Sequence, residues 1–197
     1  AGASGNCAAV NNLGSNLIGP GAQQTAAVTA TVNNGVAGIN NGAVTLQYTT
    51  NGQLIDPAFV TQNANAQTIN LQATGYNAAV GSATPDPVVL ANQRTGGSQS
   101  QVLTVSNSAP AGSFTEKLNA GFGNTTGNAT HNGGTVSLLA AGDPGSTAMA
   151  VGVDTSTAGA RSGTVTLNYQ TDGNGTSGLA AASAGSQVIN VSGNVYQ

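Results

Sequence analysis

The sequence predicts an all-β protein made of two tandem antiparallel β-sandwiches, the first lacking the N-terminal strands of the repeat. Apolar residues fall at every second position of 163–173, which is typical of a strand with one buried face. The same design occurs at 42–52, 121 positions earlier. No window has the apolar spacing of an amphipathic helix, and turns rich in Gly, Asn, Pro and Ser recur between the candidate strands. This pattern favours a sandwich.

Within the first copy, alternation predicts three strands and an apolar pair predicts a fourth, short one. The expected strands are Leu17-Ile18, 26–32, 42–50 and 67–76. In the second copy the expected strands are 101–106, 135–140, 147–154, 163–171 and 187–196. For the segment 101–106 the sequence does not decide which face is buried, because either Val102 and Thr104 or Leu103 and Val105 could face the core. With seven aromatic residues in the chain, we expect thin cores of Val, Leu, Ile and Ala.

A break in composition at Gly81–Pro87 predicts the boundary between two domains, 1–82 and 83–197. Pro85 and Pro87 stiffen this stretch and restrict its direction.

The two copies align over most of their length, which indicates a duplication. Residues 27–52 match 148–173 without a gap, and after a one-residue deletion Gln67–Tyr76 matches Gln187–Tyr196. Residues 84–121 then have no counterpart in the first copy. Three explanations stay open: loss of that piece, a smaller self-sufficient first domain, or completion by a strand from a neighbouring molecule. A head-to-tail contact of the last kind would build a filament.

The charge content argues against two classes of partner. Charged residues are 5% of the chain, with three Lys+Arg against six Asp+Glu, for a net charge of −3. Nucleic acids and anionic membrane surfaces are bound through clusters of Lys and Arg, which this chain lacks. No apolar run approaches the roughly 20 residues of a membrane-spanning helix. A surface of Ser, Thr, Asn and Gln suits a secreted protein. The single cysteine, Cys7, either pairs between molecules or packs as a small apolar residue.

The order of motifs in 84–197 resembles the choice-of-anchor D repeats of bacterial secreted and surface proteins. These motifs are TPDPV at 84–88, GSQSQVLTVSNS at 97–108, TEKLNA at 115–120, AGARSGTV at 158–165 and QVINVSGNVY at 187–196. The resemblance covers the second copy and the rear two-thirds of the first. It implies exported Ig-like sandwich modules, strung in arrays, without catalytic residues.

Catalytic and metal-binding patterns are not found in the sequence, so we expect no enzyme, no cofactor and no metal. His131 is the only histidine, and its surroundings Thr130-His131-Asn132-Gly133 are typical of a solvated turn. Asp172-Gly173-Asn174-Gly175 matches part of a calcium loop but lacks its closing Glu.

Two candidate modification sites remain. Glu116-Lys117 fits a Lys–Asn isopeptide bond with Glu116 moving protons, but we favour the simpler interpretation, in which the two charges protect an exposed strand edge. Asn-X-Ser/Thr triplets begin at Asn124, Asn128 and Asn174, expected in loops accessible to glycosylation, and at Asn190, expected inside a strand.

The leading hypothesis is a non-catalytic extracellular structural protein, a homo-oligomeric subunit of a surface filament or matrix assembled by strand complementation. The alternatives are an adhesin-type module that binds surface glycans and the stalk repeats of a larger surface protein. Strand positions of the four tyrosines and the absence of Trp disfavour glycan binding. The strand 163–171 is expected in a complete core, whereas Val44, Leu46 and Tyr48 are expected to need a partner's strand.

Overall fold

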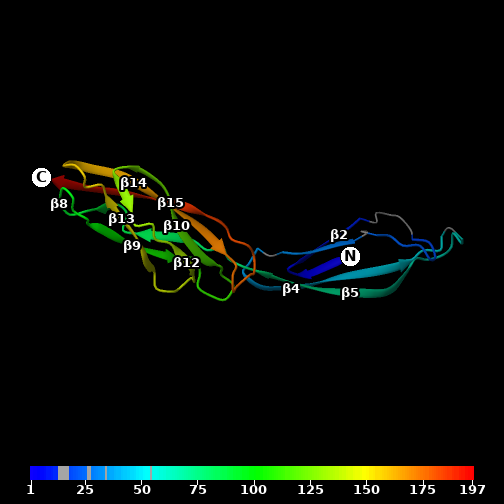
Figure 1. Ribbon diagram of the computed structural model, residues 1–197. Coiled ribbons are helices and arrows are strands. Elements are labelled where there is room, and N and C mark those ends of the chain that lie inside the picture. The colour runs from blue at the N-terminus through cyan, green and yellow to red at the C-terminus, as the bar shows by residue number, and fades with distance from the viewer. Residues whose placement is uncertain (13–17, 26–27, 34, 54) are drawn as a thin grey trace. The chain divides into compact units, whose positions relative to one another are not determined.

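The computed structural model describes residues 1–12, 18–25, 28–33, 35–53 and 55–197, and the chain divides into two compact units, Ala1–Gly75 and Tyr76–Gln197 (Figure 1). Every regular element in these ranges is a β-strand, which confirms the predicted all-β class. Of the predicted short strand, Leu17 lies outside the described residues and Ile18 is not in a strand. Ala26 and Ala27 also lie outside them.

Unit 2 contains two sheets whose faces pack together. The first has the order β12-β10-β14-β15-β7, with β8 also pairing with β15. Its strands are β7 (Val88–Val89), β8 (Gln93–Arg94), β10 (Lys117–Gly127), β12 (Val136–Leu139), β14 (Gly159–Asp172) and β15 (Ala182–Tyr196). The second has the order β11-β13-β9-β6, formed by β6 (Gly81–Thr84), β9 (Ser100–Asn107), β11 (Ala129–His131) and β13 (Ser146–Val153). Neighbours are antiparallel except β7 and β8, which run parallel to β15.

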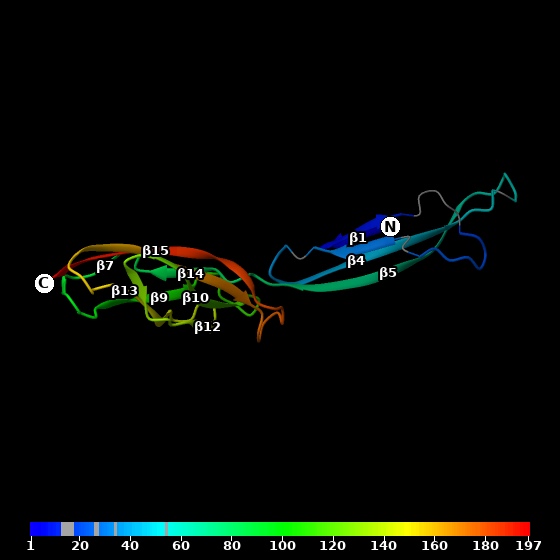
Figure 2. The same ribbon diagram turned by 45° about the horizontal axis from the view of Figure 1, so that its top comes forward.

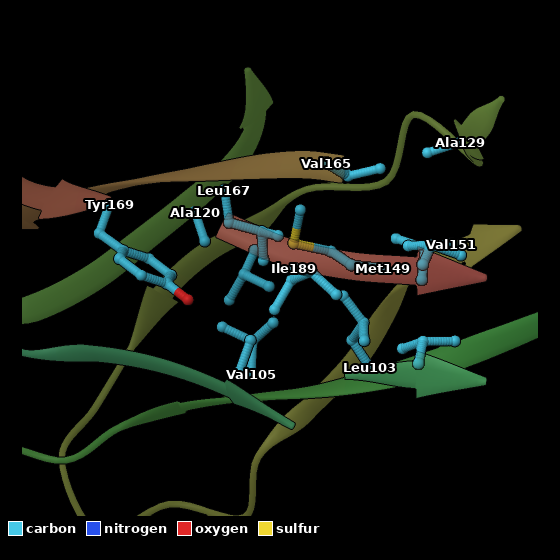
Figure 3. Close-up of a cluster of buried hydrophobic side chains, with 14 of the residues drawn as sticks. Leu103, Val105, Ala120, Ala129, Met149, Val151, Val165, Leu167, Tyr169 and Ile189 are labelled. Atoms are coloured by element: carbon cyan, nitrogen blue, oxygen red, sulfur yellow. The ribbon is translucent and has the colours of Figure 1, made fainter. Parts of the chain in front are cut away.

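The core of unit 2 lies between these sheets and is aliphatic, as expected. Figure 3 shows Leu103 and Val105 of one sheet meeting Leu167 and Ile189 of the other. All four side chains are fully buried. The structure also settles the face of β9, because Leu103 and Val105 point inward while Val102 is 45% exposed.

Unit 1 contains a three-stranded and a two-stranded sheet (Figure 2). The larger has the order β1-β4-β5, and the smaller pairs β2 with β3. The strands are β1 (Gly2–Gly5), β2 (Cys7–Asn11), β3 (Val28–Val32), β4 (Gly38–Thr50) and β5 (Gln62–Gly75). Among its described residues, Val44 is the one apolar residue whose side chain is fully buried.

The two units repeat the same strand pairing at matching positions. Val44 lies opposite Ile69 across β4 and β5, and Val165 lies opposite Ile189 across β14 and β15. The register shifts in both ladders at the same place, after Gln47 in unit 1 and after Asn168 in unit 2. Such agreement is what a duplicated sequence predicts.

Unit 1 is the shorter version of the repeat. β1 pairs with β4 as the end of β10 pairs with β14, and β2 pairs with β3 as β11 pairs with β13. The described residues of unit 1 contain no counterpart of β6, β7, β8 or β9. The described residues of unit 1 thus match the alignment, in which 84–121 have no counterpart.

The division between the units falls after Gly75, whereas the sequence placed the boundary after residue 82. Ala79 and Ala83 belong to the core of unit 2, and β6 pairs with β9. The proline-containing stretch thus lies within unit 2, between β6 and β7.

Candidate functional site

The inward face of unit 1 is incompletely covered, and this face is the candidate functional site. Tyr48 is 48% exposed, whereas its counterpart Tyr169 is 3% exposed. Ile69 is 38% exposed, whereas Ile189 is fully buried. Val44 is an exception, since it is as buried as Val165. Val44 is thus buried without a partner's strand, so the expectation was wrong for this residue, while Leu46 is half-buried and Tyr48 is exposed. That a partner's strand covers Tyr48 stays a prediction.

Val44 is buried because the described strands already cover that part of the face. β1 places Ala3 opposite Val44 in the ladder, and β2 packs nearby with Cys7 against the neighbouring Gly42. Tyr48 lies further along β4, beyond the last residue that β1 pairs. Coverage therefore ends between Val44 and Tyr48.

In unit 2 the same end of the face is covered by β6. The Tyr169 ring packs so closely on Gly81 that a Cβ on Gly81 would lie 2.3 Å from the ring. The Gln187 side chain holds the adjacent backbone, because the Ala83 N–H donates to Oε1 and Nε2 donates to the Ala83 carbonyl, both at 2.9 Å. The Tyr169 hydroxyl donates to the same Oε1 at 2.9 Å.

The described residues of unit 1 contain the same polar pair but no strand that corresponds to β6. The Tyr48 hydroxyl donates to Gln67 Oε1 at 2.9 Å, as in the Tyr169–Gln187 pair. Gln67 is exposed. The tyrosine and glutamine that contact β6 in unit 2 thus have counterparts in unit 1 that make the same hydrogen bond to each other.

Two strand edges border this face. In the described part of the chain β3 pairs with β2, and its other edge corresponds to the edge of β13 that receives β9. β5 pairs with β4, and its other edge corresponds to the edge of β15 that receives β7 and β8. Backbone N–H and C=O groups along such edges accept additional strands. Asp56 is the only residue of Ala1–Gly75 with a charged side chain, so the surroundings are almost neutral.

The structure gives Glu116 and Lys117 separate surroundings. The Glu116 carboxylate is buried and accepts hydrogen bonds from Thr171 Oγ1 at 2.6 Å and from the Ser177 hydroxyl. Lys117 is half-buried, and its Nζ lies beside the turn at Gly175. Sequence reasoning missed Thr171 and Ser177, which lie more than 50 positions away.

The candidate glycosylation residues differ in setting. Asn174 lies in an exposed turn and Asn128 in a half-buried one. Asn124 was expected in a loop but lies within β10, at the irregularity between Phe122 and Thr125, where its side chain is exposed. Asn190 lies in β15, as expected.

The remaining candidates do not form a reactive cluster. His131 ends β11 rather than lying in a turn, and its ring stacks on Phe122 with centroids 4.2 Å apart. Cys7 is a half-buried free thiol on β2. Asp172 accepts hydrogen bonds from the Asn119 side chain and the Asn174 N–H. Over the described ranges, no three His, Cys, Asp or Glu side chains form a group that could hold a metal ion. Those ranges also contain no helix suited to crossing a membrane.

No model of a known protein family matches the chain, and no curated protein matches it either.

Proposed function

We propose that the protein is a non-catalytic extracellular structural protein, a subunit of a surface filament or matrix in which a neighbouring polypeptide completes unit 1 by strand addition. The observation that carries this proposal is the difference between the two units, in which Tyr48 and Ile69 are exposed although Tyr169 and Ile189 are buried. The proposal also follows the resemblance of the repeats to choice-of-anchor D modules of exported proteins.

Strand addition satisfies two requirements at once. It removes apolar surface from water, worth about 25 cal/mol for each Å². It also pairs the backbone groups along β3 and β5, and paired backbone groups are the main source of affinity in this mode of recognition. An accepting surface on unit 1 that is filled by a segment from another subunit makes a head-to-tail contact, which extends into a chain of subunits.

A second arrangement is a stalk, in which the repeats act as spacers within a longer surface protein. The matching registers of the two ladders favour it, because repeated sandwich modules of one geometry build extended arrays. Here a preceding repeat in the same polypeptide would cover Tyr48.

Light scattering coupled to size exclusion, followed by electron microscopy, tests the proposal. We expect mass to rise with protein concentration and regular head-to-tail particles to appear. Tyr48→Lys should suppress this association, because it places a charge on the surface that must be buried. Tyr196→Lys is the matched control, since Tyr196 is similarly exposed but lies on unit 2. A monomer at high concentration would contradict self-assembly and favour the stalk arrangement.

A further inference from the structure

We propose that Thr50, Tyr48 and Gln67 select the strand that unit 1 accepts, and that this strand carries glycine above the Tyr48 ring with small residues two positions to either side. The inference rests on the proposed function and names the partner's chemistry. The occupant is an extended polypeptide segment of the same type as residues 77–107. A second polypeptide supplies it, because β6 and β9 of this chain are already paired within unit 2.

Unit 2 provides the template for this recognition. Ala79, Gly81 and Ala83 follow one another at every second position, and each meets a different inward-facing residue. The Ala79 N–H donates to Thr171 Oγ1 at 2.8 Å, Gly81 packs on the Tyr169 ring, and Ala83 is held by Gln187. Ala79 and Ala83 carry only a methyl group and Gly81 carries no side chain. Both alanines are buried.

Unit 1 presents the same three groups in the same order. Thr50, Tyr48 and Gln67 are the counterparts of Thr171, Tyr169 and Gln187, and all three are exposed. The Tyr48 hydroxyl bonds to Gln67 Oε1 as the Tyr169 hydroxyl bonds to Gln187 Oε1, which leaves the Gln67 N–H₂ group and the second lone pair of Oε1 for an incoming strand. The site is therefore preorganised for a backbone N–H and C=O.

The glycine requirement comes from the tyrosine. Any side chain on the residue above the ring would have its Cβ within 2.3–2.5 Å of the ring carbons, if the strand docks as β6 does. Heavy atoms cannot approach this closely, so either the strand or the tyrosine would have to move. A strand with a larger residue at that position is rejected.

The accepted segment must also reach the edge of β3. In unit 2, β9 pairs with both β6 and β13, and Leu103 lies opposite Met149. Val28 is the half-buried counterpart of Met149, so a β9-like strand would place its leucine beside it. A segment that includes both β6 and β9 supplies the backbone ladder as well as the contacts to Gln67.

A synthetic peptide with the sequence of residues 77–107, labelled with fluorescein, tests the inference by fluorescence anisotropy against the full chain. The titration is carried out at a concentration at which light scattering shows a monomer. We expect saturable binding. A peptide with Gly81→Val should bind at least about tenfold more weakly, because of the clash with Tyr48.

Variants of the full chain locate the site. Gln67→Ala removes two hydrogen bonds to the peptide backbone and should weaken binding about tenfold. Gln72→Ala is the matched control, since this amide lies on the same strand but on the outer face, where it bonds to Asn41. It should leave the affinity unchanged. Circular dichroism of each variant confirms that the fold is retained.

Each outcome separates this inference from the proposed function. If the peptide does not bind, or binds equally well with Gly81→Val or to Gln67→Ala, the inference is wrong even if the chain self-assembles. If the peptide binds selectively but the chain stays monomeric, the inference holds and self-assembly fails.

Discussion

At the scale of single residues, Thr171 and Thr50 occupy matching positions with different surroundings. Thr171 is buried, donates to Glu116 and accepts from the Ala79 N–H, whereas Thr50 is exposed. Thr171→Val leaves a buried carboxylate oxygen and a buried N–H with one partner fewer, and should reduce the free energy of unfolding by about 1–3 kcal/mol. Thr50→Val should change it by less than about 0.5 kcal/mol. Urea unfolding followed by circular dichroism measures both, and equal effects would contradict the assigned network.

We expect Tyr169 to make the free energy of unfolding of unit 2 fall at alkaline pH. Burial raises the pKa of Tyr169 to about 12, whereas an unfolded tyrosine has a pKa of about 10. The folded state therefore holds this proton more tightly, and the associated stability is complete below about pH 10 and is lost as the pH rises towards 12. Tyr169→Phe should reduce this alkaline loss. Thermal unfolding of both proteins between about pH 9 and 11 measures it, and identical profiles would exclude Tyr169 as the cause.

At the scale of strands, the contact between β6 and Tyr169 can be tested within unit 2 itself. Gly81→Val should lower the free energy of unfolding by about 1–3 kcal/mol, because the added atoms overlap the Tyr169 ring. Gly121→Val is the matched control, since Gly121 lies in β10 with open space around its Cβ position. It should change stability by less than about 0.5 kcal/mol. Denaturant unfolding of the two variants gives the comparison, and a stable Gly81→Val protein would show that β6 can shift away from the ring.

Strands with alternating apolar residues could be predicted from the sequence, including the short β3 and β12, whereas the long β10 and the strands of small residues could not. β4, β14 and β15 carry Val, Leu, Ile and Tyr at every second position, so their alternation is visible without neighbours. β1 and β6 consist of Gly, Ala, Ser and Thr, whose side chains carry almost no alternating hydrophobic signal. These strands form because a partner strand and a tyrosine or glycine surface are available, which is tertiary information.

At the scale of the whole molecule, the sequence alignment predicted which strands the described residues of unit 1 do not contain, but not which residues are left exposed. Tyr48 and Gln67 lie 19 positions apart, and their hydrogen bond depends on the register of β4 against β5. The role of Gln187 is visible only from its bonds to Ala83, 104 positions away. A repeat with two different surroundings therefore gives its own comparison, because unit 2 contains strands that the described residues of unit 1 do not.

The charge distribution makes a final prediction about assembly. Unit 1 has a single charged side chain, Asp56, and the proposed contact consists of backbone hydrogen bonds and apolar area. Added salt screens charges but not these interactions, so association should change little between about 50 mM and about 1 M NaCl. Urea should weaken it, because urea solvates both apolar and peptide groups. Sedimentation velocity across both series measures the effect. A strong loss of association with salt would instead place the contact on the charged side chains, which with the exception of Asp56 all lie in unit 2.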